Sequence, residues 1–238
     1  MTILNSVATT KAVTAISNLL IPGTGYVQLG KIKTALTIQF ILLASLIFIC
    51  WSGLVFSGLH LFIFVLSILI YHITTAIHAL YINPKNMQIG LFNWIACIAF
   101  STFFLGILGI TFIYKSYLLG AELYFIPSMS MYPTIKPGQF ILVDTKRYHE
   151  SKPELGDIVI IKRDSNTNIV KRIHRWPMSI PNHKNEYYVL GDNKASSYDS
   201  RKFGGISGDR ITGKAKLVVL SIDNNQNIVP GDFLLTIN

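Results

Sequence analysis

Charged side chains are scarce in this sequence, and acidic ones are missing from its whole first half. Charged residues make up 14% of the 238 residues, against about 25% in an average soluble domain. Residues 1–121 contain no acid and no arginine, and their only charged side chains are five lysines, Lys11, Lys31, Lys33, Lys85 and Lys115. Together with a mean hydropathy of +0.44, this scarcity excludes both a disordered chain and an ordinary soluble globule.

Cysteines and cofactor motifs are equally sparse. The only cysteines, Cys50 and Cys97, lie inside apolar runs, which argues against a disulfide framework. No spacing of His, Cys and Asp suggests a metal site, and no glycine-rich phosphate loop or βαβ alternation is present. The basic residues of the second half alternate with acids rather than forming a run, so nucleic-acid binding is not expected. We therefore expect no cofactor, no metal and no nucleic-acid partner.

What the first half does contain is long uncharged stretches. From Thr34 to Pro84 there are 51 residues without a charge, enough for two membrane spans of about 20 residues each. Small residues at Ser57-Gly58 divide this stretch, and Asn83-Pro84-Lys85-Asn86 forms a polar turn after it. We predict that residues 34–114 hold three transmembrane helices, near 35–56, 59–81 and 91–113, because backbone groups in lipid must pair internally.

The distribution of lysines predicts the topology. Residues 1–33 form a cytoplasmic or interfacial segment, since Lys11, Lys31 and Lys33 precede the first predicted span. Three spans then place the second half of the chain on the opposite side. Residues 12–30 are interrupted by Pro22 and Gly23, so we interpret them as interfacial or re-entrant. If these residues formed a fourth span, the N-terminus would lie on the outer side of the membrane, and residues 122–238 would stay on the side already predicted.

Residues 122–238 show short runs rich in Val and Ile, separated by Gly, Pro, Asn and Asp. The predicted strands are Gln139–Asp144, Asp157–Arg163, Ile169–His174, Glu186–Leu190 and Ile211–Ile222. No helical period of useful length is present. The fold class is therefore a membrane-anchored all-β protein, with about three N-terminal transmembrane helices followed by a compact, mostly antiparallel β-domain at 122–238.

Three features of this domain concentrate reactive side chains. Ser128 and Ser130 lie in a stiff loop between Pro127 and Pro133. Lys171 lies in the largely apolar run Ile169-Val170-Lys171-Arg172-Ile173, where it either points outward or is buried and loses its proton. The third feature is the polar loop Gly191–Arg201, with Ser197 and a predicted Asp199–Arg201 pair.

These features, in this order behind a membrane anchor, resemble type I bacterial signal peptidase, a membrane serine protease of the Ser–Lys kind. The residues that carry the resemblance are Ser130-Met131-x-Pro133-Thr134, Gly156-Asp157-Ile158-Val159, Lys171-Arg172, and Gly191-Asp192-Asn193 with Ser197-x-Asp199-Ser200-Arg201. The resemblance implies that Ser130 is the catalytic nucleophile and Lys171 its general base. Ser128 would contribute to the oxyanion hole, Ser197 would orient the lysine, and Asp199 and Arg201 would form a supporting ion pair.

The resemblance also implies a place and a set of partners. The protein would be a multi-pass protein of the bacterial cytoplasmic membrane, with its catalytic domain on the outer side. Its partners would be preprotein substrates with signal peptides, membrane lipid and the protein-export machinery. Only about nineteen residues separate Lys171 from Gly191, so the accessory β-domain of larger members is missing or reduced. A specialised pilin or conjugation-type maturation peptidase therefore stays open, as does a non-catalytic membrane assembly subunit.

The chemistry can also be argued without the resemblance. A serine hydroxyl needs an adjacent base, and a lysine serves as one only if burial lowers its pKa from about 10.4. His174 is an alternative base. However, it lies three residues after Lys171, so on a strand the two side chains point to opposite faces. Asp157 and Asp192 each follow a glycine, which favours turns over a carboxylate dyad.

Overall fold

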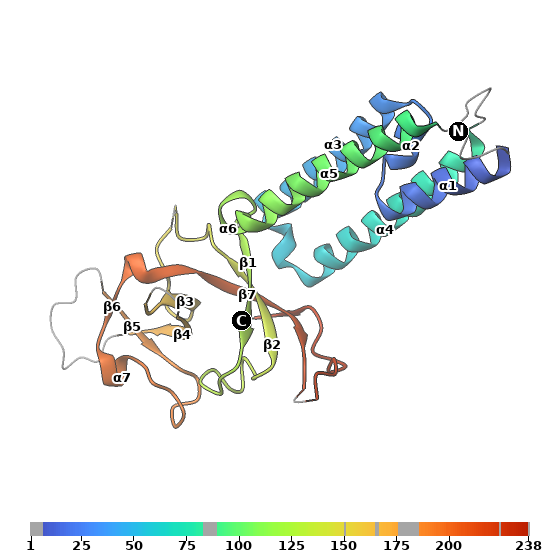
Figure 1. Cartoon of the computed structure of the whole chain (residues 1–238). Coiled ribbons are helices and arrows are strands. Elements are labelled where there is room, and N and C mark those ends of the chain that lie inside the picture. The colour runs from blue at the N-terminus through green and yellow to red at the C-terminus, as the bar shows by residue number, and fades with distance from the viewer. Residues whose placement is uncertain are drawn as a thin grey trace. The chain divides into compact units, whose positions relative to one another are not determined.

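The computed structural model describes residues 7–82, 90–149, 151–164, 167–175, 186–223 and 225–237. The chain divides into two compact units (Figure 1). One comprises residues 1–52 and 62–114 and is called the helical unit. The other comprises residues 53–61 and 115–238 and is called the β-unit.

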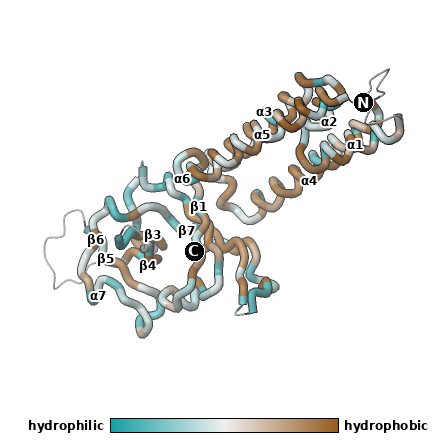
Figure 2. Tube along the Cα trace, in the orientation of Figure 1, coloured by the Kyte–Doolittle hydropathy of each residue, from teal (hydrophilic) through white to brown (hydrophobic). Residues whose placement is uncertain are grey.

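Three helices are long and apolar enough to cross a membrane in the described part of the chain. They are α3 (Ile32–Trp51), α4 (Gly58–Tyr81) and α5 (Leu91–Ile113), and the mean hydropathy of their most apolar windows is 2.1, 2.0 and 2.2. Figure 2 shows their hydrophobic character along most of their length. The prediction of three apolar helices is confirmed.

The first of these helices is shorter at its C-terminal end than the predicted span 35–56. It ends at Trp51 because Gly53 adopts a positive φ of 75°, and a short 3₁₀ turn, η1 (Leu54–Phe56), follows. The predicted polar turn at 83–86 lies outside the described residues.

Two helices precede α3, in the region predicted to be interfacial or re-entrant. They are α1 (Val7–Leu20) and α2 (Thr24–Gln28). All five residues of α2 are buried, among them Tyr26 and Val27, which pack with Phe100 of α5 in one apolar cluster. The helical unit is therefore more than three isolated spans.

The β-unit contains one antiparallel sheet, and its described strands have the order β1-β2-β7-β3-β4-β5-β6, with β8 paired to β7. The strands are β1 (Ala121–Ile126), β2 (Gln139–Asp144), β3 (Ile158–Lys162), β4 (Asn168–His174), β5 (Glu186–Leu190), β6 (Ile206–Ser207), β7 (Ile211–Ser221) and β8 (Leu235–Thr236). The prediction of an antiparallel domain is confirmed, although "all-β" describes this unit alone. Short helices α6 (Lys115–Leu118) and α7 (Ser200–Phe203) and the 3₁₀ turn η2 (Gly208–Arg210) complete it.

Two apolar clusters cover the two faces of the central strands. Ile158 and Ile160 belong to one cluster, whereas Val159 and Ile161 belong to the other. Strand β3 is therefore buried at four consecutive positions, which explains its unbroken run of β-branched residues. Between β1 and β2, Gly138 has a φ of +85°, and a Cβ there would lie 2.2 Å from the Ile222 carbonyl oxygen. Only glycine fits this turn, which closes the loop that carries Ser130.

Candidate active site

The loop that carries Ser130 leaves β1 at Ile126 and is fixed by two buried anchors. Met131 is 1% exposed and Ile135 0%, and both pack into the cluster that includes Ile126. The Ser130 carbonyl oxygen accepts a hydrogen bond from the Asn193 N–H at 3.1 Å. The loop is thus attached both to the core and to the distant loop 191–199.

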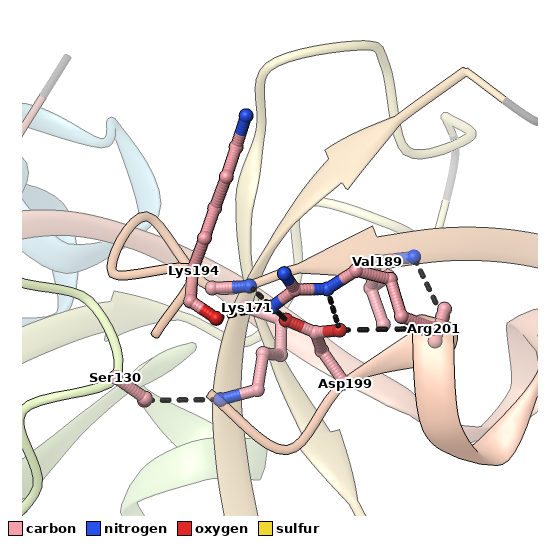
Figure 3. A network of polar contacts seen from close by, with 8 residues as sticks. Ser130, Lys171, Val189, Lys194, Asp199 and Arg201 are labelled. Carbon is pink, nitrogen blue, oxygen red and sulfur yellow. Dashed lines mark hydrogen bonds and ion pairs between the residues drawn. The ribbon is translucent and has the colours of Figure 1, made fainter. Parts of the chain in front are cut away.

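Lys171 lies on β4, between β3 and β5 in the sheet, and its side chain is turned inward. It is only 4% exposed, and its Nζ donates a hydrogen bond to Ser130 Oγ over 3.0 Å. Figure 3 shows the lysine side chain ending at this serine. The sheet therefore brings together two residues that are 41 positions apart in the sequence.

Burial lowers the pKa of Lys171, and the nearby Asp199 carboxylate opposes this effect by raising it. The net direction is downward, because burial disfavours the ammonium form more than Asp199 stabilises it. A lysine in this position is more often neutral near neutral pH than a lysine in water. It can then accept a proton from the serine that it contacts.

Of the two remaining predicted serines, Ser128 lies within hydrogen-bond distance of Ser130, and Ser197 makes no hydrogen bond to Lys171 among the described contacts. Ser128 Oγ lies 3.2 Å from Ser130 Oγ. Ser197 is 4% exposed, and its hydroxyl lies near Asp199, whose pKa it helps to lower, although its Oγ makes no hydrogen bond of ordinary geometry among the described residues. The hydrogen bond expected from Ser197 to the lysine amine is therefore not among the contacts of this structure, and its orienting role stays a prediction.

Gly191 explains how Ser197 comes so close to the Ser130 loop. A Cβ at Gly191 would lie 2.2 Å from Ser197 Oγ and 2.5 Å from the Ser130 carbonyl oxygen. No real side chain fits in such a space, so residue 191 must be glycine for the two loops to approach each other. From the sequence, Gly191 was identified as the first residue of a polar loop and of a motif that resembles the family, but its close approach to Ser197 was not predicted.

The predicted Asp199–Arg201 pair is present and bidentate (Figure 3). Arg201 Nε donates to Asp199 Oδ1 over 2.8 Å and Nη2 donates to Oδ2 over 2.7 Å. The Gly191 N–H also donates to Oδ2 at 3.0 Å. Burial alone would raise the pKa of Asp199, but the hydrogen bonds from Arg201 and Gly191 outweigh it and hold this pKa well below its usual range. Arg201 also donates to the Lys194 carbonyl oxygen, which fixes the loop on both sides of Ser197.

A second ion pair was not predicted and joins β4 to the same loop. Arg172 Nε and Nη2 donate to the two carboxylate oxygens of Asp192, each over 2.9 Å. Asp157 is instead held by Tyr148 and Lys214. Each aspartate is paired with a cation, so Asp192 is more than a turn residue. The sequence did hold a signal for a second role of this strand. Arg172 follows Lys171 directly, and neighbours on a strand face opposite sides, so the two cations must have different partners.

His174 is exposed, whereas Lys171 and Ile173 are buried, so this histidine does not share the side of the strand that faces Ser130. His183 lies outside the described residues. Among the described residues, no group of three or more His, Cys, Asp or Glu side chains could hold a metal ion. Lysine is therefore the basic group that the described structure places against Ser130.

The sequence is similar to known peptidases. Residues 91–177 and 178–220 match the profile of signal peptidase, peptidase S26. Signal peptidase IB of Staphylococcus aureus (strain Mu50 / ATCC 700699) is 30% identical over 152 residues, which cover 63% of this chain and 75% of that protein. The chloroplastic thylakoidal processing peptidase 1 of Arabidopsis thaliana is 29% identical over 38% of this chain and 39% of its own length. The chain thus matches less than half the length of that plant relative.

An antiparallel β-unit that follows apolar helices and holds a serine against a buried lysine defines a membrane-associated serine peptidase. The matched profile covers more than half of the sequence. The chain belongs to the signal peptidase family, peptidase S26.

Proposed function

We propose that this protein is a membrane-bound serine endopeptidase that removes signal peptides from exported preproteins, with Ser130 as nucleophile and Lys171 as general base. The observation that carries the proposal is the 3.0 Å contact between Lys171 Nζ and Ser130 Oγ, made by a lysine that is 4% exposed. Membership of the signal peptidase family supports the substrate class.

The first half of the reaction forms an acyl-enzyme. Neutral Lys171 accepts the Ser130 proton while Oγ attacks the scissile carbonyl carbon, and the carbonyl oxygen becomes an oxyanion. The Ser130 N–H and the Ser128 hydroxyl are the proposed donors to that oxyanion, each worth about 3 kcal/mol if well aligned. The Lys171 ammonium then donates its proton to the leaving amine, and the mature protein departs.

The second half releases the signal peptide. Lys171 is neutral again after the amine leaves, so it can deprotonate a water molecule that attacks the acyl carbon. Collapse of the second tetrahedral intermediate breaks the bond to Ser130 Oγ, and the ammonium returns a proton to that oxygen. One lysine thus acts alternately as base and acid, as histidine does in other serine proteases.

The residues around the dyad are proposed to position it. Ser197 would form a hydrogen bond with the lysine amine in the substrate complex, and the Asp199–Arg201 pair would hold the loop on which Ser197 lies. The pairing of Asp199 with Arg201 also affects the pKa of Lys171. An unpaired Asp199 carboxylate would raise the pKa of Lys171 more strongly and would keep it protonated.

The proposed place of action follows from the lysines. With Lys31 and Lys33 on the cytoplasmic side of a bacterial cytoplasmic membrane, three spans put the β-unit on the outer side. There it would meet preproteins as they emerge from the protein-export machinery, with membrane lipid around its helices.

The proposal is tested with purified protein in detergent and two substrates. One is a preprotein whose signal ends in Ala-x-Ala, and the other is a pilin precursor. The Ser130→Ala variant is the matched control for contaminating proteases. The proposal is supported when the parent protein cleaves the first substrate and the Ser130→Ala variant does not. Cleavage of the pilin precursor only would identify a dedicated maturation peptidase, and no cleavage of either would favour a non-catalytic assembly subunit.

A further inference from the structure

The helix α1 has the opposite amphipathic pattern from a helix in water. Its buried positions are polar and four residues apart, namely Thr10, Thr14 and Asn18, which are 3%, 0% and 0% exposed. Its outward positions include Ile16 and Leu20, which are 58% and 74% exposed. A helix with polar residues inside and apolar residues outside is suited to hydrocarbon rather than water.

The last residue of the inward polar stripe, Asn18, is paired through its Oδ1 with the segment that follows α1. Asn18 Oδ1 accepts hydrogen bonds from the N–H groups of Gly23 and Gly25 at 3.1 and 3.0 Å. Thr24 Oγ1 donates to the Ser17 carbonyl oxygen at 2.6 Å. The irregular backbone between α1 and α2 is thus satisfied within the protein, which is the condition for non-helical chain at membrane depth.

The helices α1 and α2 lie side by side and run in opposite directions. Just before α2, the Gly23 N–H donates to Asn18 Oδ1 at 3.1 Å. A Cβ at Gly25 would lie 2.1 Å from the Thr14 carbonyl oxygen. Asn18, near the end of α1, therefore lies against the residue that precedes α2, and the earlier residue Thr14 lies against a position inside α2. This order means that the two helices are antiparallel.

Contacts with α5 give the depth of this pair. The Gly23 Cβ position lies 3.3 Å from the Phe100 ring, the Thr24 carbonyl oxygen contacts Cys97 Sγ, and Asn93 Nδ2 donates to the Gln28 carbonyl oxygen at 3.1 Å. At 1.5 Å per residue these positions lie about 14, 9 and 3 Å from the start of α5 at Leu91. The turn between α1 and α2 is the deepest point, and α2 leads back toward the helix end.

The helix α4 gives the same order of depths from its other terminus. The Leu19 carbonyl oxygen lies 3.3 Å from His72 Nδ1, and Tyr26 Oη lies 2.7 Å from His78 Nδ1. These histidines are about 14 and 5 Å from the end of α4 at Tyr81. Measured along either α4 or α5, the turn between α1 and α2 lies about 14 Å from the helix end. This depth is less than half of the roughly 30 Å hydrocarbon core.

We propose that α1 and α2 form a re-entrant hairpin, which enters and leaves the bilayer at the face that carries Lys31 and Lys33. The outer face of α1 contacts the acyl chains of lipids. Lys11 is nine residues from Leu20, or about 14 Å along the helix, which returns it to the same face. A continuing span would instead place Lys11 about 28 Å from that face. The proposal concerns topology alone and stands whether or not the protein cleaves signal peptides.

The test uses single cysteines in a Cys50→Ala, Cys97→Ala background, checked for insertion and melting temperature. Lys11→Cys, Lys33→Cys and Asn225→Cys are exposed to a membrane-impermeant maleimide in right-side-out and inverted vesicles. Asn225 is an exposed residue of the β-unit and marks the opposite face. We expect Lys11→Cys and Lys33→Cys to react from one side and Asn225→Cys from the other. Reaction of Lys11→Cys from the Asn225 side would show that α1 crosses the membrane and would overturn the proposal.

A spin label at Ile16→Cys tests the lipid contact, with Thr14→Cys as the matched inward position. In reconstituted vesicles the label at 16 should collide more often with oxygen, which concentrates in hydrocarbon, than with a water-soluble nickel complex. The label at 14 should be shielded from both. A label at 16 that prefers the nickel complex would place α1 in water and would refute the hairpin.

Discussion

Replacing Lys171 by arginine and by methionine distinguishes a proton-accepting lysine from a structural cation. Arginine keeps the positive charge but is effectively never deprotonated in a protein, whereas methionine removes the charge and keeps a similar length. If Lys171 is the base, both variants lose activity. Loss of one member of such a catalytic unit costs about a thousandfold or more in kcat, so we expect at least this decrease for each variant.

The effect of burial on the fraction of neutral Lys171, and so on the rate, has an upper limit. With the reference pKa of about 10.4, only about 1 lysine in 250 is neutral at pH 8. Since Lys171 is 4% exposed and its pKa is lowered by burial, the structure can raise the active fraction by at most about 250-fold at that pH. The rate should therefore rise with pH on its acid side, with an apparent pKa below 10.4, and should level off once the lysine is neutral.

The burial of Lys171 also makes the stability of the folded protein depend on pH in a definite direction. Because the pKa of Lys171 is lower in the folded than in the unfolded state, folding releases protons and the parent chain gains stability as pH rises between the two values. Below the folded-state pKa, burying the ammonium costs free energy that Lys171→Met does not incur. We therefore expect the methionine variant to melt at the same or a higher temperature than the parent at neutral pH and to lack this rise.

The assay is cleavage of an Ala-x-Ala preprotein over a range of pH, with melting temperatures recorded for each variant. Lys194 is the control, since its side chain is exposed while only its backbone carbonyl bonds Arg201. Lys194→Arg and Lys194→Met should keep nearly full activity. A folded Lys171→Arg enzyme with substantial activity would refute the Ser–Lys mechanism, and His174 would then be tested as the base.

Three further predictions concern the neighbours of Lys171. Ser130→Ala should abolish cleavage without unfolding the protein; retained cleavage would direct attention to Ser128. Ser197→Ala should lower kcat by about ten- to a thousandfold, as expected for a lost orienting partner, and should shift the acid limb of the pH profile, whereas a structural role would leave the limb in place. Gly191→Ala should reduce both activity and melting temperature, because its Cβ would lie 2.2 Å from Ser197 Oγ; unchanged kinetics would mean that the two loops can separate.

Several elements could be read from local pattern because their signal lies within a few consecutive residues. The predicted strands Gln139–Asp144 and Glu186–Leu190 have the same limits as β2 and β5. Strand β1 was not predicted, although Ala121–Ile126 carries apolar and aromatic residues, because it follows a membrane span with little polar sequence between them. The register of β1 against β2 is a long-range property that no local pattern specifies.

The sequence by itself determined that the first half is apolar and helical and that the second half is a β-domain, and the family resemblance of its motifs directed attention to Ser130, Lys171 and the loop 191–201. Charge, hydropathy and alternation are local properties, so they survive without coordinates. Only the tertiary structure decided that the Lys171 amine is buried against Ser130, that Arg172 pairs with Asp192, and that Ser197 lies beside Gly191. Each of these contacts joins different strands or loops, and its geometry depends on how the sheet is paired rather than on the spacing of residues along the chain.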